Sequence, residues 1–329
     1  MIDAETAVGI TTTVPCEVVF AAGLRPVDLN NRFITSPDPA RMVEHAEHAG
    51  FPRNTCAWIK GIYSAARALG LRRIIAVARG DCSNTHALAE ILETEGIEII
   101  DFSFPYRRQA RDLASELERL CARLGTTLEA AEEQKRRLDA VRRTVREIDR
   151  LTFEEGRVSG EENHLWLINC SDFRGDPDRY ARDAETFLAA ARKRPPRPEG
   201  VRLAVIGIPP ICSDLYPALE GLGGTVVFNE MQRQFSMPYE TGTLLEQYQN
   251  YTYPYDIFFR LADVEREIKR RRAAAVVHYV QSFCFRGIQD RLVRRALGLP
   301  ILTLECDRPG PLDARSRTRI EAFMEMLSA

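Results

Sequence analysis

The sequence predicts an α/β protein with two Rossmann-like domains, each built on a doubly wound and mainly parallel sheet, and a helical section between them. Short apolar runs rich in β-branched residues recur along the chain, as expected for strands buried on both faces of a parallel sheet. Each run leads through a turn into a helical pattern. The 329 residues are enough for about two domains, each with its own core.

The predicted strands fall into two groups, one in each half of the chain. The first group comprises residues 7–13, 25–30, 73–78 and 96–105. The second group comprises residues 202–208, 225–230, 273–281 and 299–305. Because helical patterns separate the strands of each group, we expect βαβ units and parallel pairing in both halves.

Helical patterns fill the section between the two groups. Residues 107–151 are highly charged and carry apolar stripes at helical spacing, which predicts a helical hairpin. Residues 161–191 are also predicted to be helical, and the basic, proline-rich stretch 192–200 is typical of a linker. The predicted organisation is an N-terminal α/β domain (1–106), a helical hairpin and linker (107–199) and a C-terminal α/β domain (200–329).

One region in the second half follows neither pattern. Residues 231–259 are rich in Gln, Tyr and Phe and lack a regular periodicity. Long irregular segments of this kind are often functional loops. We therefore expect a long loop or lid whose aromatic side chains pack over another part of the molecule.

Charge and hydropathy exclude several classes of partner. The formal net charge is -2, which gives no indication of binding to nucleic acid or to a membrane surface. No apolar run approaches the roughly 20 residues needed to span a bilayer. The first ten residues, MIDAETAVGI, lack the basic region and apolar core of a signal peptide. We expect a cytoplasmic protein with no nucleic-acid or membrane partner.

The cysteines are the most informative residues. The chain has eight and no CxxC pair, which argues against ribbon-type zinc sites and ferredoxin-type cluster loops. Five of them directly follow a predicted buried strand, namely Cys16, Cys82, Cys212, Cys284 and Cys306. Cys56 lies at the start of a predicted helix, whereas Cys121 and Cys170 lie within helices.

Open α/β sheets bind ligands at the carboxyl ends of their strands, so this placement predicts a shared site. Two facing domains would place three thiols from each half around one cleft between them. Ligation by thiolates alone is typical of iron–sulfur clusters, zinc or copper(I). Three cysteines per cubane would leave one iron open for chemistry, whereas closed structural zinc sites need four ligands and fit this arrangement less well.

Several segments resemble the 2-hydroxyacyl-CoA dehydratase and benzoyl-CoA reductase subunit family, and the similarity covers essentially the whole chain. The segments are TTTVPCEVVFAAGLRPVDLNN, CAWIKG, GDCSNTHAL, HYVQSFCFR and LPILTLECDRPGPLDARSRTRIEAF. The resemblance implies two Rossmann-like domains and a cubane held by Cys56, Cys82 and Cys284. It also implies a partner ATPase, itself an iron–sulfur protein, that supplies low-potential electrons one at a time.

Three further cysteines depart from the plain dehydratase pattern. Cys16, Cys212 and Cys306 stand where many relatives have other residues, and six cysteines resemble the double-cubane branch of the family. In that branch two 4Fe–4S cubanes share a bridging sulfide, giving an oxygen-sensitive 8Fe–9S cluster. The branch is similar to reductases of small unsaturated or nitrogenous molecules, which makes dehydration of an acyl-CoA less expected here.

The leading hypothesis is therefore a homodimeric reductase that carries one double-cubane cluster per chain and reduces a small molecule. The predicted ligands are Cys16, Cys56, Cys82, Cys212, Cys284 and Cys306, with Cys170 as a possible replacement for Cys212. Backbone N–H groups around Ser83 and Asn84 are expected to contact the cofactor and tune its potential. Candidate proton donors or substrate contacts are Lys60, His86, His278, Gln281, Glu17 and Glu305.

Two alternatives stay open at this point. The first is a 2-hydroxyacyl-CoA dehydratase subunit with a single 4Fe–4S cluster that acts through a ketyl radical. The second is a non-catalytic cluster carrier or maturation partner. The chain has no GxxxxGK[ST] loop, so in either catalytic hypothesis we expect ATP hydrolysis on the partner reductase.

Overall fold

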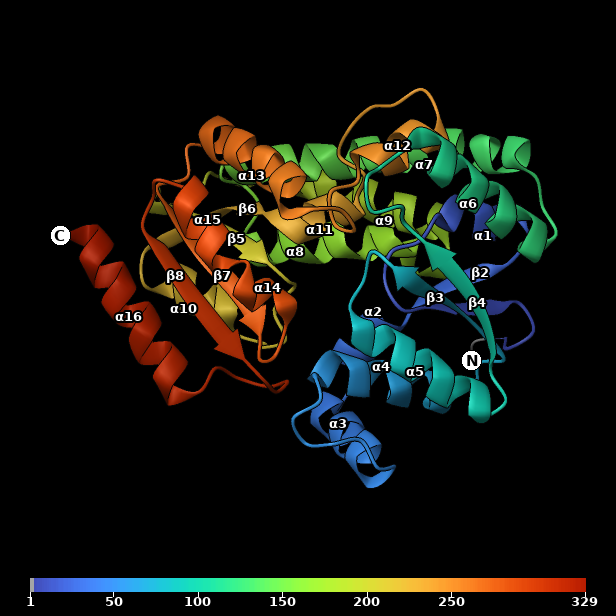
Figure 1. Ribbon diagram of the computed structural model, residues 1–329. Helices are drawn as coiled ribbons and strands as arrows, with labels where there is room; N and C mark the ends of the chain where they lie inside the picture. Colours follow the sequence, from blue (N-terminus) through green and yellow to red (C-terminus); the bar gives the residue numbers. More distant parts are fainter. Residues whose placement is uncertain (1–2) are drawn as a thin grey trace. The chain divides into compact units, whose positions relative to one another are not determined.

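A computed structural model of the chain describes residues 3–329 and shows the predicted α/β architecture (Figure 1). Within these residues there are two four-stranded sheets, and every strand pair in both is parallel. The predicted fold class, two Rossmann-like domains with a helical stretch between them, is therefore confirmed. Met1 and Ile2 lie outside the described residues. They are the first two of the ten N-terminal residues that were compared with a signal peptide above.

The chain forms two compact units that are not continuous in sequence. The first unit contains the described residues up to Arg143 together with Asn169–Arg182 and Met237–Asp256. The second unit contains Thr144–Ile168, Asp183–Ser236 and Ile257–Ala329. The two units show which residues lie close together in the folded chain, and this does not test which stretch folds by itself. The domain boundaries predicted after residue 106 and after residue 199 therefore stay predictions.

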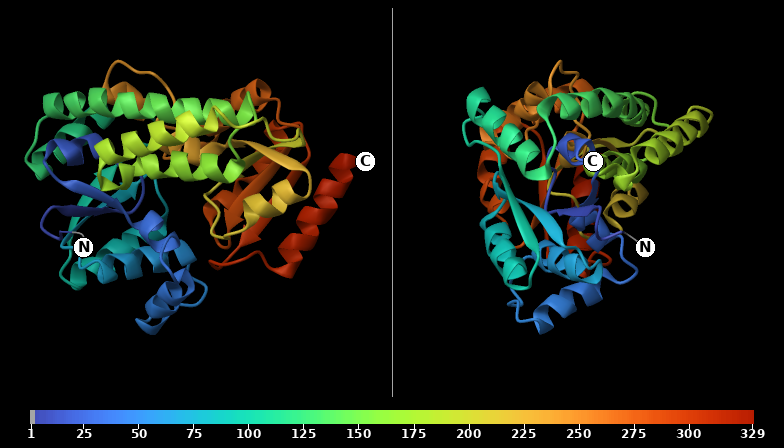
Figure 2. Two further views of the ribbon diagram at one scale, coloured as in Figure 1. Left: turned by 180° about the vertical axis from the view of Figure 1, so that it is seen from behind. Right: turned by 90° about the vertical axis from the view of Figure 1, so that its right-hand side faces the viewer.

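The sheet of the first unit has the strand order β2-β1-β3-β4. Its strands are β1 (Ala7–Ile10), β2 (Arg25–Asp28), β3 (Arg73–Arg79) and β4 (Glu98–Ser103). The helices that connect or follow these strands are α1 (Cys16–Ala21), α2 (Leu29–Ile34), α3 (Pro39–His48), α4 (Ala57–Ala68), α5 (Ser83–Thr94) and α6 (Ala110–Leu124). Helices α4 and α5 lie on one side of this sheet and α1 and α6 on the other, so the sheet is doubly wound (Figures 1 and 2).

The sheet of the second unit repeats this topology, with the order β6-β5-β7-β8. Its strands are β5 (Val201–Gly207), β6 (Gly224–Asn229), β7 (Ala275–Gln281) and β8 (Ile301–Cys306). Its later helices are α10 (Leu215–Gly221), α11 (Glu230–Phe235), α13 (Ile257–Arg271), α14 (Phe285–Ile288), α15 (Asp290–Ala296) and α16 (Ala314–Ser328). Strand β7 is buried along its whole length, as its apolar composition predicts.

The strand orders fix where a ligand can be held. In each sheet the chain first adds a strand on one side of the first strand and then crosses to its other side. The crevice at this reversal is the usual ligand site of open α/β sheets, and it lies beyond the carboxyl ends of the two central strands. Those strands are β1 and β3 in the first unit and β5 and β7 in the second.

The helical section matches the prediction in type but not in detail. It consists of α7 (Leu128–Phe153), α8 (Gly160–Ile168), two short 3₁₀ turns (Asn169–Ser171 and Phe173–Gly175) and α9 (Pro177–Ala191). The helix predicted over 161–191 is thus interrupted. Phe173 and Arg174 have φ of 49° and 54°, a left-handed conformation that no α-helix can contain. Cys170 consequently lies in a 3₁₀ turn and not in an α-helix.

The prediction of a loop or lid over residues 231–259 is wrong. The region contains most of α11, all of α12 (Leu244–Asn250) and the start of α13. Tyr248 and Tyr251 are at most 1% exposed, so the aromatic content serves packing. A capping box of Thr243 and Glu246 begins α12, which shows that local helix signals were present.

Helix α2 was also missed by the prediction, which extended the second strand to residue 30. Asp28 ends β2 because its side chain accepts hydrogen bonds from the backbone N–H groups of Asn30 and Asn31, an N-cap that starts α2 at once. Helix α2 then packs closely on α4. An ideal Cβ at Gly61 would lie only 2.2 Å from the Phe33 ring, so this contact requires glycine.

Candidate metal centre

Two of the predicted ligands in the first unit follow its central strands. Cys16 is the first residue of α1, after β1, and is 1% exposed. Cys82 is the N-cap of α5, after β3, and is half-buried. Gly80 makes the intervening turn with φ of 102°, and a Cβ there would lie 2.9 Å from Cβ of Phe104. Both thiols therefore lie at the strand reversal of this sheet.

Neither thiol is a thiolate in the absence of a metal. Burial raises the pKa of Cys82, and the neighbouring Asp81 raises it further, against hydrogen bonds from the backbone N–H groups of Thr85 and Asn84. Burial also raises the pKa of Cys16, with the charge of Glu17 as the next cause. A metal cation that replaced either proton would balance the negative charge of a thiolate that lies close to an acidic side chain.

Glu17 is held by a buried polar network around Cys16. Its carboxylate accepts from Arg142 at 2.6 Å, Gln247 at 2.7 Å and Tyr248 at 2.8 Å. Burial alone would raise the pKa of Glu17, but the charge of Arg142 and the hydrogen bond from Gln247 lower it. The Cys16 thiol donates to the same carboxylate at 3.8 Å. Glu17 is thus a fixed anion that orients the Cys16 side chain.

The remaining predicted residues of the first unit lie on α4 and α5. Cys56 is the half-buried N-cap of α4. Lys60 is 2% exposed, and its ammonium group donates to Glu47 at 2.7 Å and to the carbonyl of Arg53 at 2.8 Å. These contacts join α4 to α3 and to the preceding loop. Three further predicted residues are exposed on the first turn of α5: Ser83, Asn84 and His86.

The second unit places its three predicted ligands in the same way. Cys212 follows β5, Cys284 is the N-cap of α14 after β7, and Cys306 is the last residue of β8. Phe283, just before Cys284, has φ of 60°, a strained conformation for an aromatic residue. The turn after β7 is therefore held in a costly backbone conformation that presents Cys284 at the start of the helix.

Cys212 and Cys306 contact each other. They share a hydrogen bond that lowers the pKa of Cys306 to about 7 and raises the pKa of Cys212. The hydroxyls of Tyr279 and Ser316 also bond to the Cys306 sulfur and stabilise its thiolate. Tyr279 lies 3.8 Å from the Cys212 sulfur, so its hydroxyl contacts both thiols.

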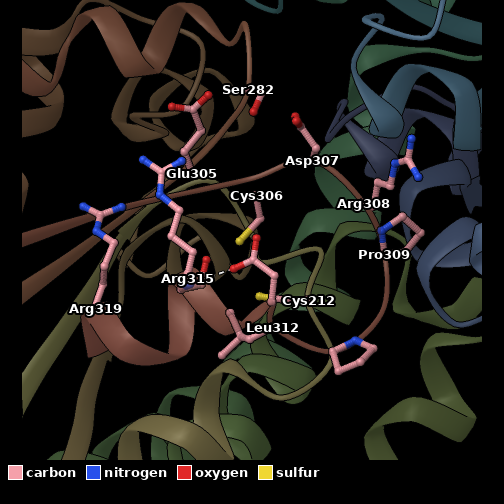
Figure 3. A pocket seen from close by; sticks show the side chains of 13 residues that line it. Cys212, Ser282, Glu305, Cys306, Asp307, Arg308, Pro309, Leu312, Arg315 and Arg319 are labelled. Atoms are coloured by element: carbon pink, nitrogen blue, oxygen red, sulfur yellow. Dashed lines mark hydrogen bonds between the residues drawn. The ribbon is translucent and has the colours of Figure 1, made fainter. Parts of the chain in front are cut away.

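Both thiols line a cavity of about 500 Å³ in the second unit. Figure 3 shows the two sulfurs in the middle of this cavity, with Arg315, Arg319 and Glu305 on one side and Asp307 and Arg308 on the other. Polar side chains and both signs of charge thus surround the thiol pair. The other lining residues are Ser282, Pro309, Pro311, Leu312, Asp313 and Ser316.

Two predicted residues of β7 are buried. Gln281 is the register partner of Cys306, is 2% exposed, and neither polar atom of its side chain has a hydrogen-bond partner among the described residues. His278 is fully buried, and its Nδ1 lies 2.7 Å from Asp290. Burial lowers the pKa of His278, so the ring is neutral.

Within the second unit, the structure groups three of the predicted residues. Cys212, Cys306 and Glu305 share one cavity. Within residues 3–329, no group of three or more His, Cys, Asp or Glu side chains is close enough to hold a metal ion. Sequence reasoning missed Tyr279 and Ser316, which contact the thiol pair. The only signal for them was their position, since Tyr279 lies two residues before Gln281 and Ser316 in the first turn of α16.

A comparison with protein families identifies the class to which these features belong. The model of the HGD-D family, described as 2-hydroxyglutaryl-CoA dehydratase, D-component, matches residues 11–327. The chain belongs to this family. No curated protein matches the sequence closely enough to count as a relative.

Family membership carries three general consequences. The chain is an enzyme subunit of a family that includes iron–sulfur dehydratases and reductases. The family implies an iron–sulfur cluster, and its proteins work with an activator that donates electrons. The free thiols at the strand ends have the donor chemistry that such a cluster needs. In the part of the chain that the structure describes, no helix is long and apolar enough to cross a bilayer.

Proposed function

We propose that this protein is a homodimeric, cytoplasmic iron–sulfur reductase with one 8Fe–9S double-cubane cluster per chain. The observation that carries the proposal is the repeated placement of thiols. Cys16 and Cys82 follow the two central strands of one sheet, and Cys212 and Cys284 follow the two central strands of the other. Each unit adds a third thiol, Cys56 or Cys306, so three thiols per unit match three cysteines per cubane.

When bound, the cluster would supply low-potential electrons, received one at a time from an ATP-hydrolysing activator, for the reduction of a small unsaturated or nitrogenous molecule. The six cysteines would hold it as thiolates. Backbone N–H groups at the start of α5, around Ser83 and Asn84, would donate to the cluster and raise its potential.

The polar residues divide into structural and site roles under this proposal. Lys60 and Glu17 are held in ion pairs inside the first unit and position the nearby cysteines. Gln281 has unused hydrogen-bonding capacity beside Cys306, and Glu305 lines the cavity, so these two are the best candidates for substrate contact and proton donation. His86 is exposed, whereas His278 is bound to Asp290 and serves as its neutral hydrogen-bond partner.

A second candidate is a 2-hydroxyacyl-CoA dehydratase subunit with a single 4Fe–4S cluster. The description of the matching family favours it. Cys56, Cys82 and Cys284 would then be the ligands, and Cys16, Cys212 and Cys306 would stay free. A subunit of this kind needs a different partner subunit, whereas the proposed reductase is a homodimer.

Iron and acid-labile sulfide, measured on anaerobically purified protein, separate the two candidates. We expect about eight irons and nine sulfides per chain for the double cubane, against about four of each for a single cubane. The Cys212→Ser variant should lose iron under the first proposal and keep it under the second. Cys121→Ser is the matched control, because this buried thiol lies within α6 and should not affect iron content. Zinc without sulfide would refute both proposals.

A further inference from the structure

The cavity of the second unit contains a pair of thiols that is able to react without any cluster. The segment after β5 is fixed to the segment after β8: Cys212 and Gly310 form an isolated parallel bridge, and the Ser213 N–H donates to the Gly310 carbonyl at 2.8 Å. Asp214 adds a hydrogen bond from the Leu312 N–H at 2.7 Å. The backbone therefore holds the two cysteine-bearing segments together independently of the sulfurs.

The two sulfurs are chemically different. Cys306 is half-buried and lines the cavity, and Cys212, Tyr279 and Ser316 contact its sulfur. Cys212 lines the same cavity but is only 7% exposed. The more exposed sulfur is the one that a reagent in the cavity meets first, and the buried thiol in contact with it is placed to resolve the product.

The cavity is also suited to a charged reagent. Arg308, Arg315 and Arg319 line it, together with Glu305 and Asp307. A small peptide-like disulfide has carboxylate and ammonium groups that would pair with side chains of both signs. Its central sulfur atoms are uncharged and would meet the thiol pair in the middle of the cavity (Figure 3).

We propose that, in the protein without its cluster, Cys212 and Cys306 form a reversible intrachain disulfide by exchange with a low-molecular-weight disulfide such as glutathione disulfide. The Cys306 thiolate attacks one sulfur of the reagent, a mixed disulfide forms and one glutathione thiolate leaves. Cys212 then loses its proton and attacks the Cys306 sulfur, releasing the second thiolate. The two protein thiols lose two electrons, and one reagent disulfide is reduced to two thiols.

This chemistry goes beyond the proposed function, because it concerns the chain before a cluster is bound. For the proposed function, the consequence is that the redox state of this thiol pair controls whether the chain can bind a cluster. An oxidised pair cannot ligate iron, so the chain would accept a cluster only after reduction of this bond. The exchange requires only the thiol pair, so it can fail or succeed independently of the iron count.

The test uses the full-length chain, freed of iron by a chelator under anaerobic conditions, and incubated with glutathione disulfide. Mass spectrometry of alkylated peptides should find Cys212 joined to Cys306 and the other six cysteines still alkylated. Excess reduced glutathione should restore both free thiols. The wild-type chain alone suffices for this measurement, so the result does not depend on the stability of any variant.

Variants then assign the two roles. Cys212→Ser should accumulate a stable glutathione adduct on Cys306, because the resolving thiol is missing. Cys306→Ser should form neither the disulfide nor an adduct on Cys212, and Cys121→Ser should behave like the wild type. The proposal is overturned if Cys212 and Cys306 both stay alkylated in the wild type, or if either pairs with Cys284 instead. The iron and sulfide count of the reduced chain tests the proposed function separately.

Discussion

Glu17 is a buried carboxylate whose charge depends on one guanidinium. Glu17 is 0% and Arg142 1% exposed, and the pair lies directly beside Cys16. Removing one partner of a buried pair leaves an uncompensated charge, so we expect Arg142→Met to lower the free energy of unfolding by about 3–5 kcal/mol. Denaturant titration monitored by circular dichroism measures this change.

Arg137 provides a matched control on the same helix. Its ion pair with Asp178 is exposed on both sides, so Arg137→Met should cost less than about 1 kcal/mol. Similar losses for the two variants would mean that the Glu17 network does not stabilise the fold.

His164 is expected to make stability depend on pH. Burial lowers its pKa to about 4, and its Nδ1 lies 2.8 Å from Nε2 of Gln232, from which the neutral ring accepts. The unfolded chain, with an ordinary histidine pKa of about 6.5, binds this proton more readily. Stability should therefore fall as the pH drops from about 6.5 to about 4, and this histidine should cause no further loss below that range.

The size of this effect is limited by solvent. Because the ring is only partly buried, we expect a loss nearer to about 1 than to about 3 kcal/mol. His164→Gln keeps an acceptor for Gln232 and should remove this part of the pH dependence, measured as the difference from wild type between pH values of about 4 and 7. The exposed His86→Gln is the control, and an identical slope in all three proteins would contradict the assignment.

Single residues also show how far sequence reasoning reaches into the site. The positions of Cys82 and Cys284 were predictable, because a buried strand followed by a turn and a helix is a local pattern. The partners of Glu17 were not predictable. Arg142 and Tyr248 are 125 and 231 residues away in sequence, and packing alone brings them together.

The contact between α2 and α4 illustrates the same limit for whole elements. Gly61 lets the Phe33 ring lie against the α4 backbone. Gly61→Ala should therefore lower the unfolding free energy by about 1–3 kcal/mol through overpacking. Gly221→Ala, in α10, places its methyl group where no atom lies within 4 Å and should be neutral or stabilise by up to about 1 kcal/mol.

The comparison of these two glycine variants is made by thermal unfolding. Equal stability of Gly61→Ala and wild type would show that α2 can shift to accept the methyl group. The close contact in the structure would then have no energetic importance.

Helices and strands were predicted well where their periodicity was regular. All eight predicted strands are present, because each is an apolar run between turn residues. Helix α11 was missed because it has only six residues and no exposed polar face that would reveal it. All residues of α11 are buried, including Arg233 and Gln234.

The division into compact units has a consequence for the whole molecule that fragments can test. Residues 200–329 contain the entire second sheet but lack α8 and the end of α7. Asn229 would lose its bonds to Gly160 and Asn163, and the fully buried Arg271 would lose Asp149. We expect this fragment not to unfold cooperatively, because the buried Arg271 keeps only Glu267 of its two carboxylate partners and Asn229 loses two hydrogen bonds.

A longer fragment, residues 144–329, restores these partners and should show a cooperative thermal transition by circular dichroism. If the shorter fragment were equally cooperative, the boundary at residue 200 predicted from the sequence would mark an independent domain. The sequence alone could not reveal the two units. A proline-rich linker shows where regular structure is interrupted, but it does not show which other parts of the chain will pack there.

The identical strand orders of the two sheets, β2-β1-β3-β4 and β6-β5-β7-β8, also have a historical meaning. When the sheets are matched strand by strand, Cys16 corresponds to Cys212 and Cys82 corresponds to Cys284, whereas Cys56 and Cys306 have no counterparts. Duplication and fusion of one ancestral gene would produce this pattern. A half-length ancestor of that kind would have carried two thiols, and the third thiol of each half would have no counterpart in it.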